Sequence, residues 1–197
     1  MKQAINFIAL NSEYCSRGRF VAMDFAKKSG FTYFDDQSLL CDLKELDELL
    51  KTPEINESIT LEIRSIHERL KPAMIKAASL GPCIIHERAA KAVLKEYEGL
   101  FTVMIQANDF EQKLLHAHID PKVKSIQTKV DSIKEEDRSW ITDYIYNQDH
   151  IRRHYHDTLV TMPWGGRTSY DLILNSDRLS VEQCGDLIKA AVRLSGQ

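Results

Sequence analysis

No run of apolar residues in this chain is long enough to cross a membrane, which argues against a transmembrane helix. The run at residues 4–10 is also too short for the hydrophobic core of a secretion signal. Cysteine is sparse and scattered, so the four thiols show neither the spacing of a metal site nor the density of a small disulfide-bonded domain. These absences predict a cytoplasmic protein with reduced thiols and no membrane partner.

Neither sign of charge prevails, because 26 lysines and arginines face 29 acidic residues and leave a formal net charge of -3. This balance gives no indication that the protein binds nucleic acid or an anionic membrane. A phosphate site would therefore need a local cluster of basic residues. The length of 197 residues suits one domain that buries enough surface to fold without a disulfide or a metal.

Short apolar runs rich in Ile, Val and Phe alternate along the chain with longer stretches of helical period. The runs lie at 4–10, 82–86, 101–107 and 170–175, with 31–34 as a weaker fifth candidate. The helical pattern covers 18–29, 36–51, 55–79, 87–98, 109–118 and 180–194. This alternation predicts buried parallel strands joined by right-handed crossovers, and hence an α/β three-layer sandwich.

Residues 121–160 differ from the rest of the chain, because they are dense in charge and contain no convincing strand. We expect helices here that project from the sheet as a lid or arm. The chain shows no internal repeat and no low-complexity tract, so nothing indicates a division into independent domains.

The stretch "NSEYCSRGRFVA", residues 11–22, joins the first expected strand to the first expected helix. The free N–H groups and the dipole of a helix N-terminus attract anions, Gly18 would let the backbone approach a phosphate, and Arg17 and Arg19 would supply charge. Arg19 stands where a phosphate loop has lysine, and Phe20 stands where it has a metal-binding hydroxyl. The pattern G-x-x-x-x-G-K-[ST] is absent, so an ordinary turn remains an alternative at this point.

The segment "WGGRTSYDLILNS", residues 164–176, resembles the ending of the cytidylate kinase-like family, in which a W-G-D-type loop precedes Y-D-L-x-[LI]-N-[ST]. "DHIRRHYH" at 149–156 is similar to the lid motif D-K-x-R-x-x-Y-Y of that family, with matches at Asp149, Arg152 and Tyr155.

Three further motifs carry the same resemblance. "PCIIHERAAKAVL" at 82–94 is similar to V-I-V-G-R-x-A-x-x-[IV]-L, with Arg88 matching and Glu87 in place of the glycine. "GFTYFDDQSLL" at 30–40 is similar to G-I-P-Y-Y-D-x-x-L-[IL], with Asp35 matching. The first loop is similar to S-R-E-Y-G-S-G-G-R-x-[IV]-A, which already has arginine in place of lysine, whereas Cys15 and Arg17 replace two glycines and Ser12 replaces an arginine.

The resemblance implies a P-loop nucleoside monophosphate kinase fold, with a five-stranded parallel sheet and a helical lid in a single domain. Its core would comprise 1–40, 81–118 and 164–197, its monophosphate-binding region about 36–80, and its lid about 121–163. The implied activity is phosphoryl transfer from ATP to a nucleoside monophosphate, with a cytidine nucleotide as acceptor. Nucleotides are then the expected partners, and ATP with Mg²⁺ the expected cofactors.

The resemblance also implies roles for individual residues. Four loop residues would bind the donor phosphates, namely Ser16, Arg17, Gly18 and Arg19. Asp35 and Arg88 would bind the acceptor. Arg152 and Arg153 would move in on the lid and, with Arg19, offset charge on the transferred group. Mg²⁺ would be held largely through water, because Phe20 offers no ligand.

Two other functions remain open. The departures at positions 12, 15, 17 and 87 favour a catalytically silent member of the same fold that binds a nucleotide as a sensor or interaction module. A kinase for another small acceptor is also possible, because fold does not determine substrate. A protein metal site is not expected, since the histidine pairs 116/118 and 154/156 are spaced i, i+2 and would face different sides of a helix.

Overall fold

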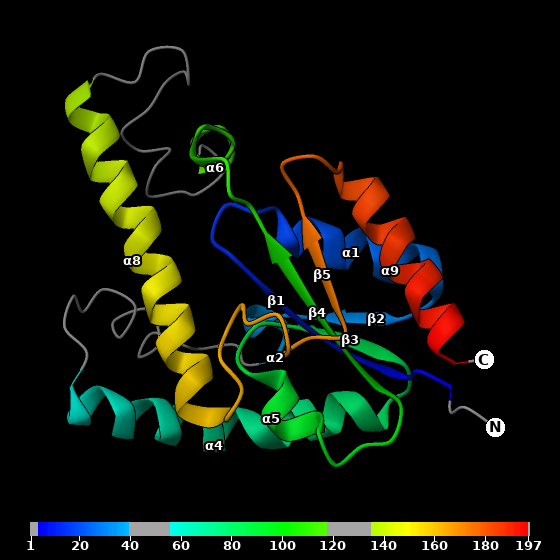
Figure 1. Ribbon diagram of the computed structural model, residues 1–197. Coiled ribbons are helices and arrows are strands. Elements are labelled where there is room, and N and C mark those ends of the chain that lie inside the picture. Colours follow the sequence, from blue (N-terminus) through cyan, green and yellow to red (C-terminus); the bar gives the residue numbers. More distant parts are fainter. Residues whose placement is uncertain (1–3, 40–55, 118–134, 197) are drawn as a thin grey trace.

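The computed structural model describes residues 4–39, 56–117 and 135–196 (Figure 1). Its centre is a parallel five-stranded sheet in the order β2-β3-β1-β4-β5. The strands are β1 (Phe7–Ser12), β2 (Thr32–Phe34), β3 (Cys83–His86), β4 (Leu100–Gln106) and β5 (Leu172–Asn175). The predicted parallel sheet is confirmed, and its weakest candidate forms the three-residue edge strand β2, which pairs with β3 from Thr32 opposite Cys83.

Seven helices are described. They are α1 (Gly18–Ser29), α2 (Asp36–Leu39), α4 (Glu57–Ser79), α5 (Ala90–Leu94), α6 (Phe110–Ala117), α8 (Glu135–Leu159) and α9 (Val181–Ser195). The predicted helix over 36–51 lies mostly outside the described residues, as do residues 121–134 of the predicted lid. None of the described helices combines the length and the apolar character needed to cross a membrane.

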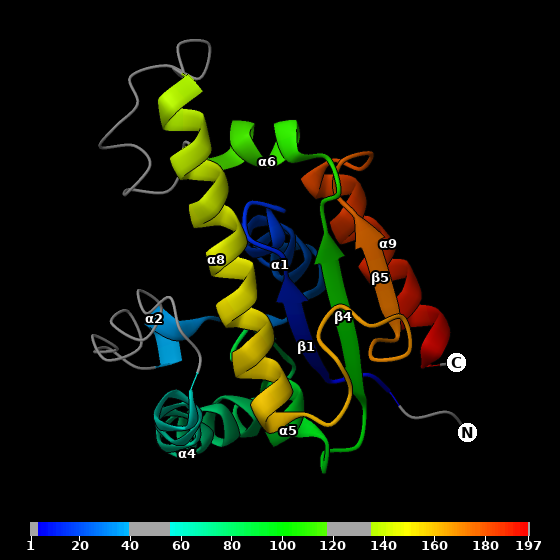
Figure 2. The ribbon, with the colours of Figure 1, turned by 60° about the vertical axis from the view of Figure 1, so that its left-hand side comes forward.

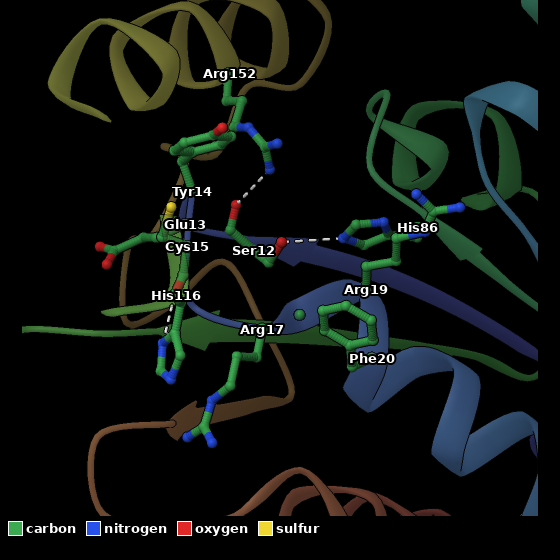
Figure 3. A pocket seen from close by; sticks show the side chains of 11 residues that line it. Ser12, Glu13, Tyr14, Cys15, Arg17, Arg19, Phe20, His86, His116 and Arg152 are labelled. Atoms are coloured by element: carbon green, nitrogen blue, oxygen red, sulfur yellow. Dashed lines mark hydrogen bonds between the residues drawn. The ribbon is translucent and has the colours of Figure 1, made fainter. Parts of the chain in front are cut away.

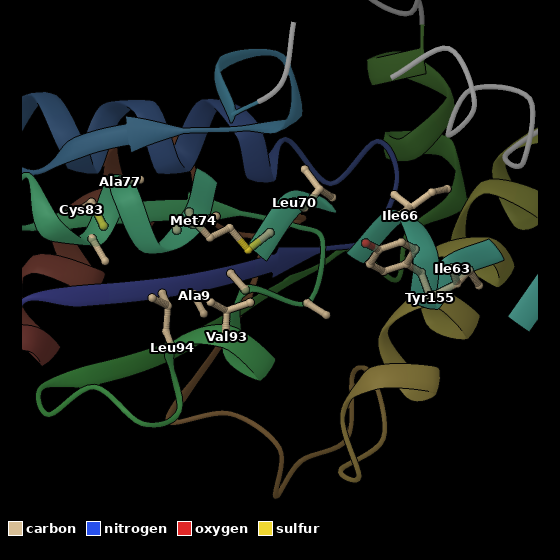
Figure 4. Packing of buried hydrophobic residues seen from close by; sticks show 14 residues of the cluster. Ala9, Ile63, Ile66, Leu70, Met74, Ala77, Cys83, Val93, Leu94 and Tyr155 are labelled. Atoms are coloured by element: carbon tan, nitrogen blue, oxygen red, sulfur yellow. The ribbon is translucent and has the colours of Figure 1, made fainter. Parts of the chain in front are cut away.

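The helices cover both faces of the sheet and form the predicted three layers (Figures 1 and 2). α1 and α9 lie on one face, where Phe25 and Ile188 pack against strand residues such as Ile8. α4 and α5 lie on the other face, where Leu70 and Met74 of α4 belong to a second buried cluster with Ala9, Ile85 and Leu94 (Figure 4). Burial of each large apolar side chain contributes about 1.5–3 kcal/mol to folding, so both faces stabilise the sheet.

The helix predicted over 87–98 is wrong in its extent, because α5 covers only Ala90–Leu94. Glu87, Arg88 and Ala89 have φ angles of 71°, 54° and 52°, so the chain follows a left-handed path that cannot belong to a right-handed helix. The sequence pattern was misleading because Ala90, Val93 and Leu94, all buried, have the spacing i, i+3, i+4 of a helix.

In the charged segment predicted to project from the sheet as a lid or arm, the described part belongs to the long helix α8, which packs against α6 and α4. Figures 1 and 2 show α8 running from α6 at one end to α4 and α5 at the other. Ile141 and Ile145 are buried with Leu114 of α6, and Tyr155 joins the core cluster of α4. This packing places the middle of α8, with Asp149 and Arg152, beside the loop between β1 and α1.

Candidate functional site

A cavity of about 250 Å³ lies at the carboxyl end of β1, where the chain turns into α1. Its lining comes from residues 12–15 and 17–20, together with His86 of β3, His116 of α6 and Arg152 of α8 (Figure 3). Ligands of open α/β sheets bind outside the carboxyl ends of the strands, so this is the position expected of a binding site.

The loop between β1 and α1 takes a path that would suit glycine at two positions. Cys15 has φ 62° and Arg17 has φ 64°, so both residues adopt the left-handed conformation. A left-handed residue other than glycine costs about 1–3 kcal/mol and persists only where its surroundings hold it. The Arg17 guanidinium provides such a restraint, because it donates to the carbonyl oxygens of Ser176 and, at 2.9 Å, Leu179, beyond the end of β5.

Two other predicted phosphate-binding residues are held closely within the loop. Ser16 is buried, and both its N–H and its hydroxyl donate to the Glu13 carbonyl oxygen, at 3.1 and 2.7 Å. Gly18 is the first residue of α1 and lies directly against the Ser12 side chain.

Replacement of Gly18 by alanine is expected to destabilise the protein, because the added Cβ would overlap the Ser12 Cβ. Overpacking of this kind costs about 1–3 kcal/mol. The melting temperature should fall by about 2–4 °C for each kcal/mol lost. Thermal unfolding followed by circular dichroism measures the change, with Met23→Ala, at a half-exposed position of the same helix, as the control. A Gly18→Ala protein as stable as the wild type would contradict this close approach.

Arg19 lines the cavity and forms an ion pair with Asp35, with 3.1 Å between Nη2 and Oδ2. The Tyr33 hydroxyl donates to the same carboxylate oxygen at 3.1 Å, and Ser38 N–H donates to the other at 3.0 Å. Burial opposes ionisation of Asp35, but the hydrogen bonds from Ser38 and Tyr33 and the charge of Arg19 outweigh it and lower its pKa. The structure thus brings together Arg19, which was assigned to the phosphate donor, and Asp35, which was assigned to the phosphate acceptor.

A buried lysine ties the same loop to its neighbours. Lys113 of α6 lies 2.9 Å from the Glu13 carboxylate and 3.0 Å from that of Asp149. Glu13 also accepts from Ala107 N–H at 3.0 Å, and Asp149 accepts from Tyr14 N–H at 2.5 Å. Burial opposes the charge of Lys113, but the two carboxylates outweigh it and raise its pKa. The loop is therefore fixed to α6 and α8 by charged hydrogen bonds.

Arg152 reaches the cavity from α8 and is held by three contacts. Its Nη1 donates to the Ser12 carbonyl oxygen at 3.2 Å and to Glu87 Oε1 at 3.0 Å. Its guanidinium carbon lies 5.4 Å from the centre of the Tyr14 ring, within the range of a cation–π interaction. The predicted lid arginine therefore lies beside the loop in the described structure.

The Glu87 side chain is buried among donors. Its Oε1 accepts from the Ser12 N–H and the Ser12 hydroxyl, both at 2.8 Å, and from Arg152, while His86 Nε2 lies 3.3 Å away. Burial opposes the carboxylate charge, but Arg152, followed by His86 and Ser12, outweighs it and holds the pKa of Glu87 far below its ordinary value.

This lowered pKa predicts a pH dependence of stability. A carboxylate whose pKa is lowered by folding stabilises the protein fully above its unfolded pKa of about 4.3 and loses that contribution as the pH falls below it. We expect the difference in unfolding free energy between the wild type and Glu87→Gln to shrink below about pH 5, by at most about 1.4 kcal/mol per pH unit. Urea unfolding between pH 7 and pH 3 measures it. A difference that stays constant over this range would contradict the prediction.

Arg88 and Arg153, two other predicted site residues, do not line the cavity. The guanidinium of Arg88 lies 5.6 Å from the centre of the Tyr155 ring, and that of Arg153 lies 5.7 Å from the centre of the Trp164 ring. Both residues neighbour groups that do approach the loop, because Arg88 follows Glu87 and Arg153 follows Arg152. Their assigned contacts with nucleotide remain predictions.

The motif at 170–176 joins strands and does not line the cavity. The Asp171 carboxylate accepts from the Thr102 N–H and hydroxyl, at 2.8 and 2.7 Å, which ties the start of β5 to β4. Ser176 N–H and its hydroxyl donate to the Gln106 carbonyl oxygen at the other end of the same pair. Trp164 is buried with Met104 and Tyr170.

Sequence reasoning missed the contributions of His86, Lys113 and His116. His86 ends a strand and meets the Ser12 hydroxyl at 3.0 Å, and His116 lies 3.1 Å from the Cys15 carbonyl oxygen. A polar residue at the carboxyl end of a buried strand was a signal for His86. Within residues 4–39, 56–117 and 135–196, no three His, Cys, Asp or Glu side chains gather in an arrangement that could hold a metal ion.

Comparisons with known proteins agree with this architecture. A model of the cytidylate kinase-like family matches residues 7–178. An uncharacterised protein from Eubacterium ventriosum superimposes with a TM-score of 0.66 at 18% identity, over 95% of this chain and 98% of that one. A gluconokinase from Sinorhizobium meliloti gives 0.54 at 12% identity, over 98% and 95%. No curated protein matches the sequence.

A deoxyadenosine kinase from M. mycoides, whose structure holds the products dCMP and dCDP, superimposes with a TM-score of 0.52 at 11% identity, over 95% of this chain and 99% of that one. At such identities the structural likeness shows a shared kinase fold and nothing finer.

Proposed function

Because the chain belongs to the cytidylate kinase-like family, we propose that it transfers a phosphoryl group from ATP to a nucleoside monophosphate, with a cytidine nucleotide as the first acceptor to test. One observation carries the proposal. Arg19 from the start of α1 and Arg152 from α8 line one cavity beside a helix N-terminus. Phosphoryl transfer needs mainly positioning and charge neutralisation, which two arginines and the end of a helix can supply.

In this function, α1 and Arg19 would hold the donor phosphates, and Arg152 would stabilise charge on the transferred group. Asp35 and Arg88 would contribute to the acceptor site. Arg153 would act beside Arg152 and offset charge on the transferred group. Mg²⁺ would offset phosphate charge while bound mainly to phosphate oxygens and water, since Phe20, at the position of the usual hydroxyl, has no oxygen in its side chain. We expect the protein to act in the cytoplasm, where ATP is available.

Arg88→Ala tests the acceptor assignment. We expect it to raise the KM for the monophosphate by about 10-fold or more, the effect of losing a charged hydrogen bond worth about 1.5–3 kcal/mol, and to leave the KM for ATP nearly unchanged. Steady-state assays with each substrate varied in turn give both constants. Equal KM values for wild type and variant would remove Arg88 from the acceptor site.

A second candidate function is supported by the partners of the arginines. Arg19 is paired with Asp35, Arg152 with Glu87, and Arg17 with the carbonyl oxygens of Ser176 and Leu179. A protein whose basic groups are neutralised internally could bind a nucleotide without transferring phosphate, as a sensor or interaction module.

A coupled assay separates these functions. Formation of ADP from ATP would be followed with CMP, dCMP, UMP, AMP and GMP as acceptors, and with a sugar and a hydroxy acid to cover small acceptors of another class. Thermal shifts with each nucleotide would be recorded in parallel. Turnover that depends on one acceptor supports a kinase and identifies its substrate class. Binding of ATP without transfer to any acceptor would reject the kinase and favour the sensor.

A further inference from the structure

The Glu87 carboxylate is surrounded as a bound anion would be. One oxygen, Oε1, accepts from a backbone N–H and a hydroxyl of Ser12 at 2.8 Å each and from the Arg152 guanidinium at 3.0 Å. Backbone amides, hydroxyls and arginine are also the groups that bind phosphate oxygens, with charge-assisted bonds stronger than neutral ones. The same donors could therefore serve a phosphate group.

These donors belong to the cavity, although Glu87 itself does not line it. Ser12, His86 and Arg152 all line the cavity, and Figure 3 shows Ser12 between the other two. The carboxylate thus lies directly behind the cavity wall, at the carboxyl end of β3, where ligands of parallel sheets bind.

The backbone conformation at position 87 is unfavourable for glutamate. Glu87 has φ 71°, a conformation that glycine adopts freely and that strains other residues. The similar sequence motif has glycine here. The contacts of the carboxylate hold the glutamate in this conformation. With glycine at this position, Ser12 and Arg152 would have no carboxylate to bind.

The charge of Glu87 is also positioned to weaken binding. It neutralises Arg152, the cavity-lining arginine from α8, and its lowered pKa keeps it ionised at neutral pH. A phosphate entering the cavity meets a guanidinium that is already paired, with a second negative charge behind it. Both effects act against an anionic ligand.

We propose that Glu87 is a tethered anion that fills a phosphate subsite formed by Ser12, His86 and Arg152, and that it thereby lowers the affinity of the cavity for phosphate groups. The proposal rests on the proposed function only in taking the cavity to bind phosphate, and it does not require turnover.

The test is Glu87→Gly, which removes the carboxylate and suits the backbone, with inorganic phosphate as the probe. At low ionic strength, phosphate should raise the melting temperature of the variant saturably, with an apparent Kd at least 10-fold lower than that of the wild type. Chloride at equal ionic strength controls for general screening. Glu96→Gln is the matched control, because this glutamate is exposed and distant from the cavity at the opposite end of β4. Its response to phosphate should equal that of the wild type.

A Glu87→Gly protein that responds to phosphate no more than the wild type would overturn the proposal. So would a response that persists undiminished in Glu87→Gly with Arg152→Gln, because the subsite requires the arginine. Should the glycine variant fail to fold, Glu87→Ala decides, since it also empties the subsite and removes the charge. This variant should bind tripolyphosphate about 10-fold more tightly than the wild type in titration calorimetry, and equal or weaker binding would reject the tethered anion.

The outcome is separable from that of the coupled assay. Gain of phosphate binding in the variant without transfer by any form of the protein would sink the proposed kinase and leave the tethered anion intact. Phosphoryl transfer by the wild type, with no gain of phosphate binding in the variant, would support the kinase and reject the tethered anion.

Discussion

Arg19→Ala is expected to remove at least about half of the thermal stabilisation that ATP gives the wild-type protein. Arg19 lines the cavity at the first turn of α1, where helix dipole and side chain would act on the same phosphate. A hydrogen bond between charged groups is worth about 1.5–3 kcal/mol, so the affinity for ATP should fall by about 10- to 100-fold. At an ATP concentration of about 100 times the wild-type Kd, a stabilisation of about 2.7 kcal/mol would shrink to about 0.4–1.4 kcal/mol.

Thermal shifts at low salt across a series of ATP concentrations measure this loss. Arg193→Ala is the control, because this arginine is exposed in the last turn of α9 and does not line the cavity. Since Arg19 is also bound to Asp35, Asp35→Asn should be measured beside it. If ATP stabilises the Arg19→Ala protein as much as the wild type, the donor phosphates do not bind at this helix end.

Arg152→Ala should lower kcat by about 10²–10³-fold and change KM for ATP much less. Loss of one donor that acts on charge developing in the transition state has this magnitude, and it affects kcat where uniform binding would affect KM. Arg152 is suited to the role because it enters the cavity from α8 while held by Ser12 and Tyr14.

The substitution also leaves Glu87 without its cationic partner, and breaking a buried pair costs about 3–5 kcal/mol of stability. Assays must therefore be run below the measured unfolding transition of the variant. Arg152→Lys, which keeps the charge and loses the planar fork, should retain more stability and still turn over slowly. Arg138→Ala should leave kcat unchanged, because this arginine, on the same helix as Arg152, forms an exposed ion pair with Glu111 of α6. An Arg152→Ala enzyme with a raised KM and an unaltered kcat would assign this residue to ground-state binding.

The sequence predicted the sheet well because parallel strands between two helical layers are continuous apolar runs. β3 is buried along its whole length, and such a run can be recognised without its partners. The helix over 87–98 failed because the backbone path of Glu87, Arg88 and Ala89 depends on contacts with Ser12 and Arg152, residues distant in the chain.

The packing of α8 could in principle be predicted from the sequence. Ile141, Ile145 and Tyr155 recur at helical spacing within a charged segment, and each is buried. The density of charge around them led to the expectation of an arm. The direction of the Arg17 side chain was not readable, because it depends on the carbonyl groups of Ser176 and Leu179 that folding brings to the loop.

The order of the strands has a consequence for how the chain folds. β1 comes first in sequence yet lies at the centre of the sheet, where Phe7 pairs with Cys83 on one side and with Leu100 on the other. Both partners are far along the chain, and contacts at such separations are slow to form because a large loop must close first. During synthesis both edges of β1 would remain unpaired until β3 and β4 have emerged from the ribosome. Until then α1, the one helix that follows β1 directly, is the nearest element that could shield it, so slow folding and a need for chaperones should be most acute in this interval.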